Sequence, residues 1–258
     1  MKILNQPVSP MYLWTIALLA ALSALSAYTL HELPAALLLA VASAALAEIA
    51  IRALHLGLAF RMPYSGIITG LIIGAVAPVN APFPLVAAAA VIAVLSKFFL
   101  QYRGSNILNP ASAGLLVALP LFGLGDEWWI AGSYNLYGIA ITLTPILVVL
   151  AYESKRLQAG LSFAAVSFML AVALSPGSTA SAAALLPLLF GINYLFAFVM
   201  LVEPKTSPSG PIAQVVYGCG LALAYPALAY VRVPYPLLVC LLAANAAYAA
   251  YRWRTGRR

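Results

Sequence analysis

Apolar residues fill most of the chain in long blocks, and short polar or Pro-containing stretches separate these blocks. A membrane-spanning helix needs about 20 apolar residues. On this criterion the pattern predicts ten helices, of which the third is short. Their expected ranges are Met11–Leu30, Pro34–Leu54, Ser65–Ala77, Phe83–Leu100, Pro110–Leu124, Tyr134–Tyr152, Ala159–Leu174, Ala182–Val202, Pro211–Val231 and Pro234–Tyr251.

The composition leads to the same fold class. The chain has 258 residues, of which 64% are hydrophobic and 7% are charged. A soluble domain is usually about one-quarter charged, so we expect an all-α, polytopic membrane protein. The net charge of +7 does not indicate nucleic-acid binding, because the basic residues are spread over many short loops. The first apolar block is longer than a signal-peptide core, so we expect it to be retained as a helix.

Charge predicts the orientation. With ten alternating spans, one side holds only Arg232 among the 13 basic residues, and the other side holds the rest. The positive-inside rule therefore places both termini in the cytoplasm of a multi-pass protein of the cell (inner or plasma) membrane. Asp126 and Glu127 then fall outside, with Trp128 and Trp129 as expected interfacial anchors. The basic residues on the cytoplasmic side are Lys2, Arg52, Arg61, Lys97, Arg103, Lys155, Arg156, Lys205, Arg252, Arg254, Arg257 and Arg258.

The ten helices divide into two repeats, residues 1–125 and 126–258, which form one integral membrane domain. Five spans in each half imply inverted topology, a plan common among transporters. A weak echo at an offset of 126 residues supports the repeat. Val76-Ala77-Pro78 recurs as Val202-Glu203-Pro204, and Asn109-Pro110 recurs as Tyr235-Pro236.

The stretch Ser96–Gly114 carries Lys, Arg, Asn and Pro between two apolar blocks. Polar, irregular backbone at membrane depth is tolerated only inside protein or beside a cavity. We therefore interpret Arg103–Pro110 as a re-entrant, ligand-facing loop. Asn106 and Asn109 would present polar groups to the ligand, and Pro110 would begin the next helix.

Two further patches each have two interpretations. In Ser65–Gly70, small residues either pack against another helix or let a flat ligand approach, with Ser65 and Thr69 supplying hydroxyls. In Glu203–Pro208, a helix end with a carboxylate is either part of a site or a solvated turn.

The remaining polar residues have simpler interpretations. Glu48 is a candidate as an intramembrane acid, but an ion pair with Arg52 one turn away is favoured. His31 and His55 are expected at interfaces. Cys219 and Cys240 are expected as buried thiols, and no spacing predicts a zinc, iron–sulfur or other metal site. No catalytic arrangement is predicted.

Three segments resemble the family of membrane subunits that is shared by the sodium-translocating NADH:quinone oxidoreductase and the Rnf electron-transport complex. Ser65–Gly74 is similar to the family's S-x-L-L-T-G-L-L-L stretch. Ser96–Gly114 is similar to its S/A-K…G-x-N-x-F-N-P-A stretch, and Val199–Pro208 to its F-M-x-T-D-P-V-T-S-P stretch.

The resemblance implies a ten-helix, inverted-repeat subunit that passes electrons through flavin, coupled to Na⁺ or H⁺ movement. The implied flavin-binding residues are Ser65, Thr69, Gly70, Lys97, Arg103, Asn106, Asn109, Glu203 and Thr206. The implied partners are other membrane subunits, flavoprotein and iron–sulfur subunits, the lipid bilayer and a quinone.

One family feature is missing. The family attaches FMN to a Thr of an S-G-A-T motif after the fifth helix, whereas this chain has Ala131-Gly132-Ser133-Tyr134 there. Ser133 is the one candidate for such an ester. The departure favours FMN or riboflavin bound without a covalent link, between the two halves.

Two functions from different classes remain. The first is a membrane subunit of a flavin-dependent electron-transport complex, which needs partners because the chain has no NAD-binding or iron–sulfur motif. The second is a stand-alone transporter or channel for a small solute on the same scaffold, which the missing Thr favours.

Overall fold

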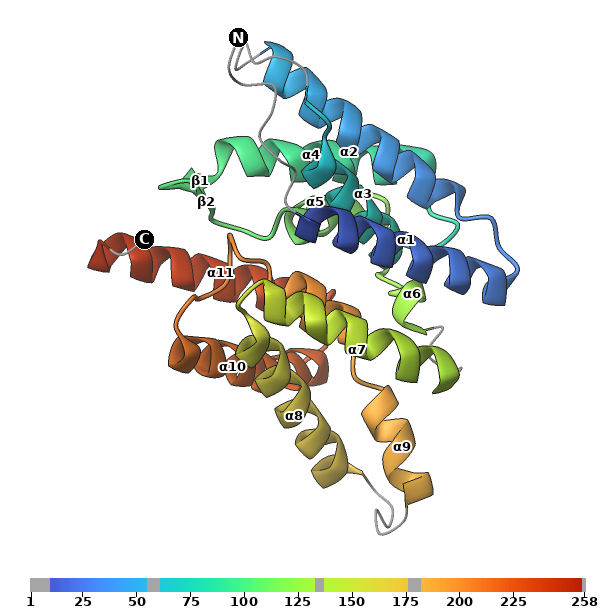
Figure 1. Cartoon of the computed structure of the whole chain (residues 1–258), viewed down its shortest axis with the longest axis vertical. Helices are drawn as coiled ribbons and strands as arrows, with labels where there is room; N and C mark the ends of the chain where they lie inside the picture. The colour runs from blue at the N-terminus through green and yellow to red at the C-terminus, as the bar shows by residue number, and fades with distance from the viewer. Residues whose placement is uncertain (1–9, 55–60, 133–136, 176–181, 257–258) are drawn as a thin grey trace. The chain divides into compact units, whose positions relative to one another are not determined.

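The computed structural model describes residues 10–54, 61–132, 137–175 and 182–256, and these residues are mostly α-helical (Figure 1). The chain divides into two compact units, Met1–Ile130 and Ala131–Arg258. Each unit is described by itself. The repeat boundary expected between residues 125 and 126 stays a prediction.

The first unit is built around α3, which contacts the four other long helices of the unit. Ile73 and Val76 of α3 are fully buried. Because other helices surround α3, it is apolar on all sides. The elements of this unit are α1 (Pro10–Leu30), α2 (Ala35–Leu54), α3 (Tyr64–Val76), α4 (Phe83–Phe99), β1 (Gln101–Tyr102), β2 (Ser105–Asn106) and α5 (Pro110–Leu121).

In the second unit, α10 packs on both α8 and α11, and η2 packs on α7 and α8. The rings of Phe163 and Phe196 meet with their centroids 5.1 Å apart. The elements are α7 (Tyr137–Glu153), α8 (Leu157–Leu174), α9 (Ala182–Phe190), the π-helix η2 (Phe196–Met200), α10 (Pro211–Tyr230) and α11 (Pro236–Thr255), and the short α6 (Trp129–Gly132) crosses the boundary between the units.

Proline marks the start of several helices. The helices α5, α10 and α11 begin at Pro110, Pro211 and Pro236, respectively. Proline is tolerated there because the N–H that it lacks would have no partner within the helix. This placement explains why the predicted and observed starts of these helices agree closely.

Four helices, α1, α2, α8 and α10, are long and apolar enough to cross a membrane, and several shorter apolar helices accompany them. The described part of the chain is thus a predominantly helical fold compatible with a membrane protein. The ten spans and their inverted arrangement stay predictions.

One predicted helix is wrong. The span expected over Ala182–Val202 is interrupted after Phe190. Asn193 then caps the following turn, because its Oδ1 accepts a hydrogen bond from the backbone N–H of Phe196 at 2.9 Å. The sequence did not reveal this break, because the whole segment is apolar. The π-helical geometry of η2 is a form often seen at functional sites.

The expected interfacial role of Trp128 and Trp129 is also corrected. Both indoles are buried within the first unit. Trp129 donates through Nε1 to the carbonyl of Gly74 at 2.6 Å, and the backbone N–H groups of Glu127 and Trp128 donate to the carbonyl of Val76. The loop therefore caps the end of α3, whose last carbonyls would otherwise lack partners.

The packing within the two units agrees with an internal repeat. A shift of 126 residues carries Pro110 onto Pro236, and both residues begin helices. In the first unit α4 contacts α2 and α5, and in the second unit α10 contacts the corresponding helices α8 and α11. The repeat that the sequence predicted is compatible with these contacts and stays a prediction.

Replacing Gly74 with Ala should destabilise the first unit. A Cβ at Gly74 would lie 2.6 Å from Cα of Leu37 in α2, so the two helices would have to separate. Overpacking of this kind costs about 1–3 kcal/mol. Thermal unfolding in detergent measures the loss. The control is Gly220→Ala in α10, where a Cβ meets nothing within 4 Å. Equal melting temperatures for the two variants would contradict the close packing of α2 and α3.

Candidate functional site

Three of the predicted site residues meet in the first unit, where α3 begins and α4 ends. Lys97 of α4 is buried, with 9% of its surface exposed. Its Nζ donates to both the carbonyl and the Oγ of Ser65, each at 2.8 Å. Thr69 Oγ1 donates to the same carbonyl at 2.9 Å. Residues from two separate sequence motifs therefore form one polar cluster, which we call the Lys97 cluster.

An ion pair with a buried carboxylate and a partly exposed arginine lies on the neighbouring part of α2. Glu48 is 1% exposed and accepts a hydrogen bond from Arg52 one turn later, as the sequence predicted. The second carboxylate oxygen, Oε2, has no hydrogen-bond partner among the described residues. It lies against α3, since a Cβ at Gly66 would be 2.9 Å away from it. The carboxylate thus occupies space that only a glycine leaves open.

The glycines of α3 face α2. Cβ atoms added at Gly66 and Gly70 would lie 2.8 Å and 2.6 Å from the carbonyls of Ala44 and Ala40. This geometry corresponds to helix packing through small residues, one of the two interpretations of the Ser65–Gly70 patch. The α2 backbone covers the side of Gly70 that a ligand would approach in the other interpretation.

The stretch expected as a re-entrant loop is a tight β-hairpin followed by a helix cap (Figure 1). Arg103 and Gly104 form its two-residue turn, both with positive φ, as type I′ turns require. Arg103 is exposed at the tip and lies over the ring of Tyr102. Asn106 is buried at the base. The hairpin tip is therefore exposed, whereas Asn106 is buried.

Asn109 caps α5. Its Oδ1 accepts a hydrogen bond from the backbone N–H of Ser112 at 3.0 Å, and the residue is 2% exposed. This contact satisfies one of the four N–H groups that a helix start leaves without a partner. A ligand contact through the side-chain amide stays a prediction beside this structural role.

Glu203 and Thr206 lie in the second unit, in the turn after η2. The Glu203 carbonyl accepts hydrogen bonds from the backbone N–H groups of Thr206 and Ser207, and from Ser207 Oγ at 2.7 Å. Thr206 and Ser207 are almost fully buried. The turn is thus buried at Thr206 and Ser207 and exposed at Pro204 and Lys205. The predicted site residues consequently fall into two sets, one in each unit.

A buried polar pair near this turn was not predicted. Asn245 of α11 is 1% exposed and donates through Nδ2 to the Tyr217 hydroxyl of α10 at 2.6 Å and to the Thr206 carbonyl at 3.4 Å. The sequence did contain a signal for this pair. An Asn within an apolar helix indicates a buried hydrogen-bond partner or a functional site.

Gln214 and Arg156 also bind the turns of the second unit. Gln214 Nε2 donates to the carbonyls of Lys155 and Ser209, and Arg156 donates to the carbonyl of Pro204 at 3.4 Å. Burial lowers the pKa of the Arg156 guanidinium from its ordinary value. These contacts hold the turn before α8 against the turn before α10.

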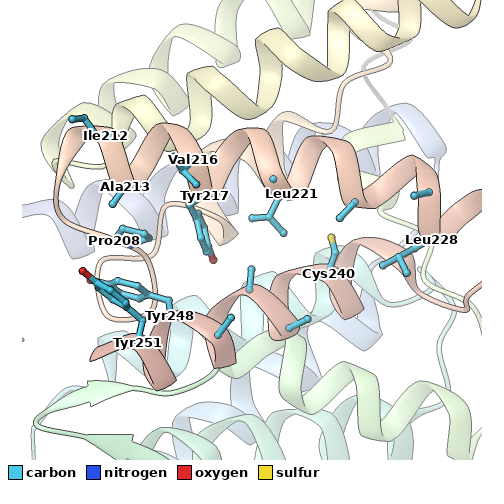
Figure 2. A pocket seen from close by; sticks show the side chains of 16 residues that line it. Pro208, Ile212, Ala213, Val216, Tyr217, Leu221, Leu228, Cys240, Tyr248 and Tyr251 are labelled. Atoms are coloured by element: carbon cyan, nitrogen blue, oxygen red, sulfur yellow. The ribbon is translucent and has the colours of Figure 1, made fainter. Parts of the chain in front are cut away.

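An apolar groove of about 950 Å³ runs between α10 and α11 (Figure 2). We call it the α10/α11 groove. Tyr217 points into it from α10 and Cys240 points into it from α11. Its lining residues are Pro208, Ile212, Ala213, Val216, Tyr217, Gly220, Leu221, Ala224, Ala227, Leu228, Cys240, Ala243, Ala244, Ala247, Tyr248 and Tyr251.

Metal binding has no support within residues 10–54, 61–132, 137–175 and 182–256, where no group of three His, Cys, Asp or Glu side chains is suitably placed. Cys219 and Cys240 are free thiols. Ser133 and His55 lie outside the described residues. The candidate ester position therefore stays a prediction.

Comparison of the chain with protein-family models and with curated proteins gave no match in either case. The family resemblance therefore rests on the residues of the three motif segments.

Asn109 allows its two roles to be separated. Asn109→Ala should lower the free energy of unfolding by about 1 kcal/mol, because α5 loses its cap. Asn109→Asp retains the Oδ1 acceptor and places a negative charge at the start of α5, so it should lose less stability than Asn109→Ala. If the Asn109 amide N–H also donates to a ligand, Asn109→Asp should weaken ligand binding more than it lowers stability. Asn109→Ala should lower both. Thermal unfolding and ligand titration of both variants test this, and normal binding by Asn109→Asp would leave only the capping role.

Asn245 and Tyr217 should be coupled energetically through their hydrogen bond. Asn245→Leu should cost about 1–3 kcal/mol, because the buried Tyr217 hydroxyl loses a partner. In the Tyr217→Phe background the same change should cost clearly less. Chemical or thermal unfolding of the four proteins measures the coupling. Additive effects would show that the contact contributes no stability.

Proposed function

We propose that the chain is a membrane subunit of a flavin-dependent, ion-translocating electron-transport complex, and that the Lys97 cluster contributes to its flavin site. The flavin would be FMN or riboflavin. The observation that carries the proposal is the buried Lys97 ammonium group, which the Ser65 carbonyl and hydroxyl hold at 2.8 Å.

The arrangement of the motifs supports this proposal. Ser65 and Thr69 belong to one family-like segment and Lys97 to another, and their side chains meet although 32 positions separate Ser65 from Lys97 in the sequence. The contact accounts for the presence of both motifs in one chain. A buried ammonium group is costly unless it is hydrogen-bonded, so the burial of this lysine at the end of α4 supports a functional role.

The expected roles follow from the charge and hydrogen-bonding capacity of each residue. Lys97 would stabilise a phosphate or a reduced, anionic flavin, because an opposite charge nearby favours the ionised form. Thr69 and Asn106 would hydrogen-bond the edge of the ring, and Arg103 would reach a phosphate from the hairpin tip. Glu203 and Thr206 of the second unit stay predicted flavin contacts, as the resemblance implies. The flavin supplies the redox chemistry, and the protein supplies position and electrostatics.

The protein would depend on partners. The sequence has no NAD-binding or iron–sulfur motif, so electrons would arrive from flavoprotein and iron–sulfur subunits. A quinone is the proposed acceptor class. Electron transfer would be coupled to movement of Na⁺ or H⁺ across the cell membrane, with both termini in the cytoplasm.

The purified protein should be yellow, or become so when FMN or riboflavin is added. Lys97→Met should weaken flavin binding by about tenfold or more, since a hydrogen bond to a charged group contributes about 1.5–3 kcal/mol. The matched control is Lys155→Met, which removes an exposed lysine from a turn of the second unit. Absorbance and fluorescence titration measure binding, and intact-chain mass spectrometry tests for covalent FMN.

A preparation that binds neither flavin would refute the proposal. So would equal affinities of the Lys97→Met and Lys155→Met variants, provided both fold. The missing Thr of the S-G-A-T motif favours the second candidate, a stand-alone transporter or channel for a small solute. Solute uptake by proteoliposomes that contain this chain alone, without a redox partner, would support that alternative.

A further inference from the structure

The α10/α11 groove lies between two helices that pack less closely than α4 and α5 of the first unit. In the first unit, Gly114 of α5 lies so close to α4 that a Cβ would be 2.1 Å from the Ala89 carbonyl. A shift of 126 residues carries Gly114 onto Cys240 of α11, whose side chain lines the groove. Cys240 therefore stands where the first unit has a glycine in close helix contact.

The groove is long and follows both helices. Its lining runs along α10 from Ile212 to Leu228, which is about 24 Å at 1.5 Å per residue. An extended hydrocarbon chain fits a groove of this length and volume.

The lining is also suited to a hydrocarbon chain. It consists mainly of Ala, Leu and other aliphatic residues, and its polar atoms are confined to a few tyrosine and cysteine side chains. Ile212 and Val216 are strongly exposed along one wall. A smooth, extended apolar surface of this kind marks an interaction with lipid or another apolar partner.

One end of the groove carries aromatic and cationic groups. Tyr248 and Tyr251 line it there, and the Arg252 guanidinium lies 5.1 Å from the centre of the Tyr248 ring. Arg254 follows Tyr251 by three positions, so it continues the same face of α11, and it is exposed. Trp253 is 72% exposed beside it. Tyrosine, tryptophan and arginine together are typical of the level of lipid headgroups.

We propose that the α10/α11 groove binds an anionic phospholipid, with a hydrocarbon chain between the two helices and the headgroup at the Tyr251–Arg254 end. Charge complementarity determines the class of lipid, because basic side chains beside an apolar groove favour a negative headgroup. This lipid site is distinct from the Lys97 cluster and does not depend on flavin binding.

Native mass spectrometry of the full chain in detergent tests the proposal, with phosphatidylglycerol and phosphatidylcholine of identical chains as probes. The protein should retain one phosphatidylglycerol, with clearly higher affinity than for phosphatidylcholine. Gly220→Leu fills the groove where a side chain meets nothing within 4 Å, and it should weaken binding about tenfold, because it displaces about two methylene groups. Arg254→Gln should lower the affinity for phosphatidylglycerol about fivefold and leave phosphatidylcholine unchanged.

Ala229→Leu is the matched control, because it enlarges an exposed residue of α10 outside the groove and should bind lipid as the unaltered protein does. Equal binding of the two lipids, or full binding by Gly220→Leu, would overturn the proposal. Glycerol phosphate that competes as strongly as the lipid would show that only the headgroup is bound. That result would also overturn the proposal. A dimer that Gly220→Leu dissociates would assign the groove to a second copy of the chain instead.

Discussion

The close approach of α3 to α2 is the contact on which the arrangement of the first unit depends. Inside a membrane, apolar side chains gain little by leaving lipid, so helices associate mainly where small residues let their backbones meet. Gly66, Gly70 and Gly74 provide such a stripe along α3. Because α3 also contacts α1, α4 and α5, its position determines where those helices lie.

This packing also positions the polar groups. Gly66 leaves room for the Glu48 carboxylate, and Ser65, the residue before it, receives the Lys97 ammonium group. Buried polar groups in an apolar medium are costly unless they are hydrogen-bonded. The same glycine stripe that joins the helices therefore brings an acid and a cation from different segments to one end of α3, which is the region proposed to serve the flavin.

The helix pairs that the predicted repeat would relate differ between the two units. Gly114 closes the α4/α5 pair, whereas Cys240 at the equivalent position accompanies an open α10/α11 pair. The polar residues of the second unit differ as well, because Asn245 and Tyr217 bind the turn that contains Thr206.

The sequence by itself determined the helical class and most helix limits, because long apolar blocks and prolines such as Pro110 and Pro236 leave few alternatives for the backbone. It also indicated Ser65, Thr69 and Lys97 as notable polar residues, and Glu48 as the partner of Arg52. Only the tertiary structure decided that Lys97 binds Ser65 and that Asn109 caps a helix. It also showed that Asn193 follows a break in an apolar run and that Asn245 has a partner in α10. The physical reason is that periodicity reports how apolar a segment is, whereas the partner of a buried polar group is set by helices that meet far apart in the sequence.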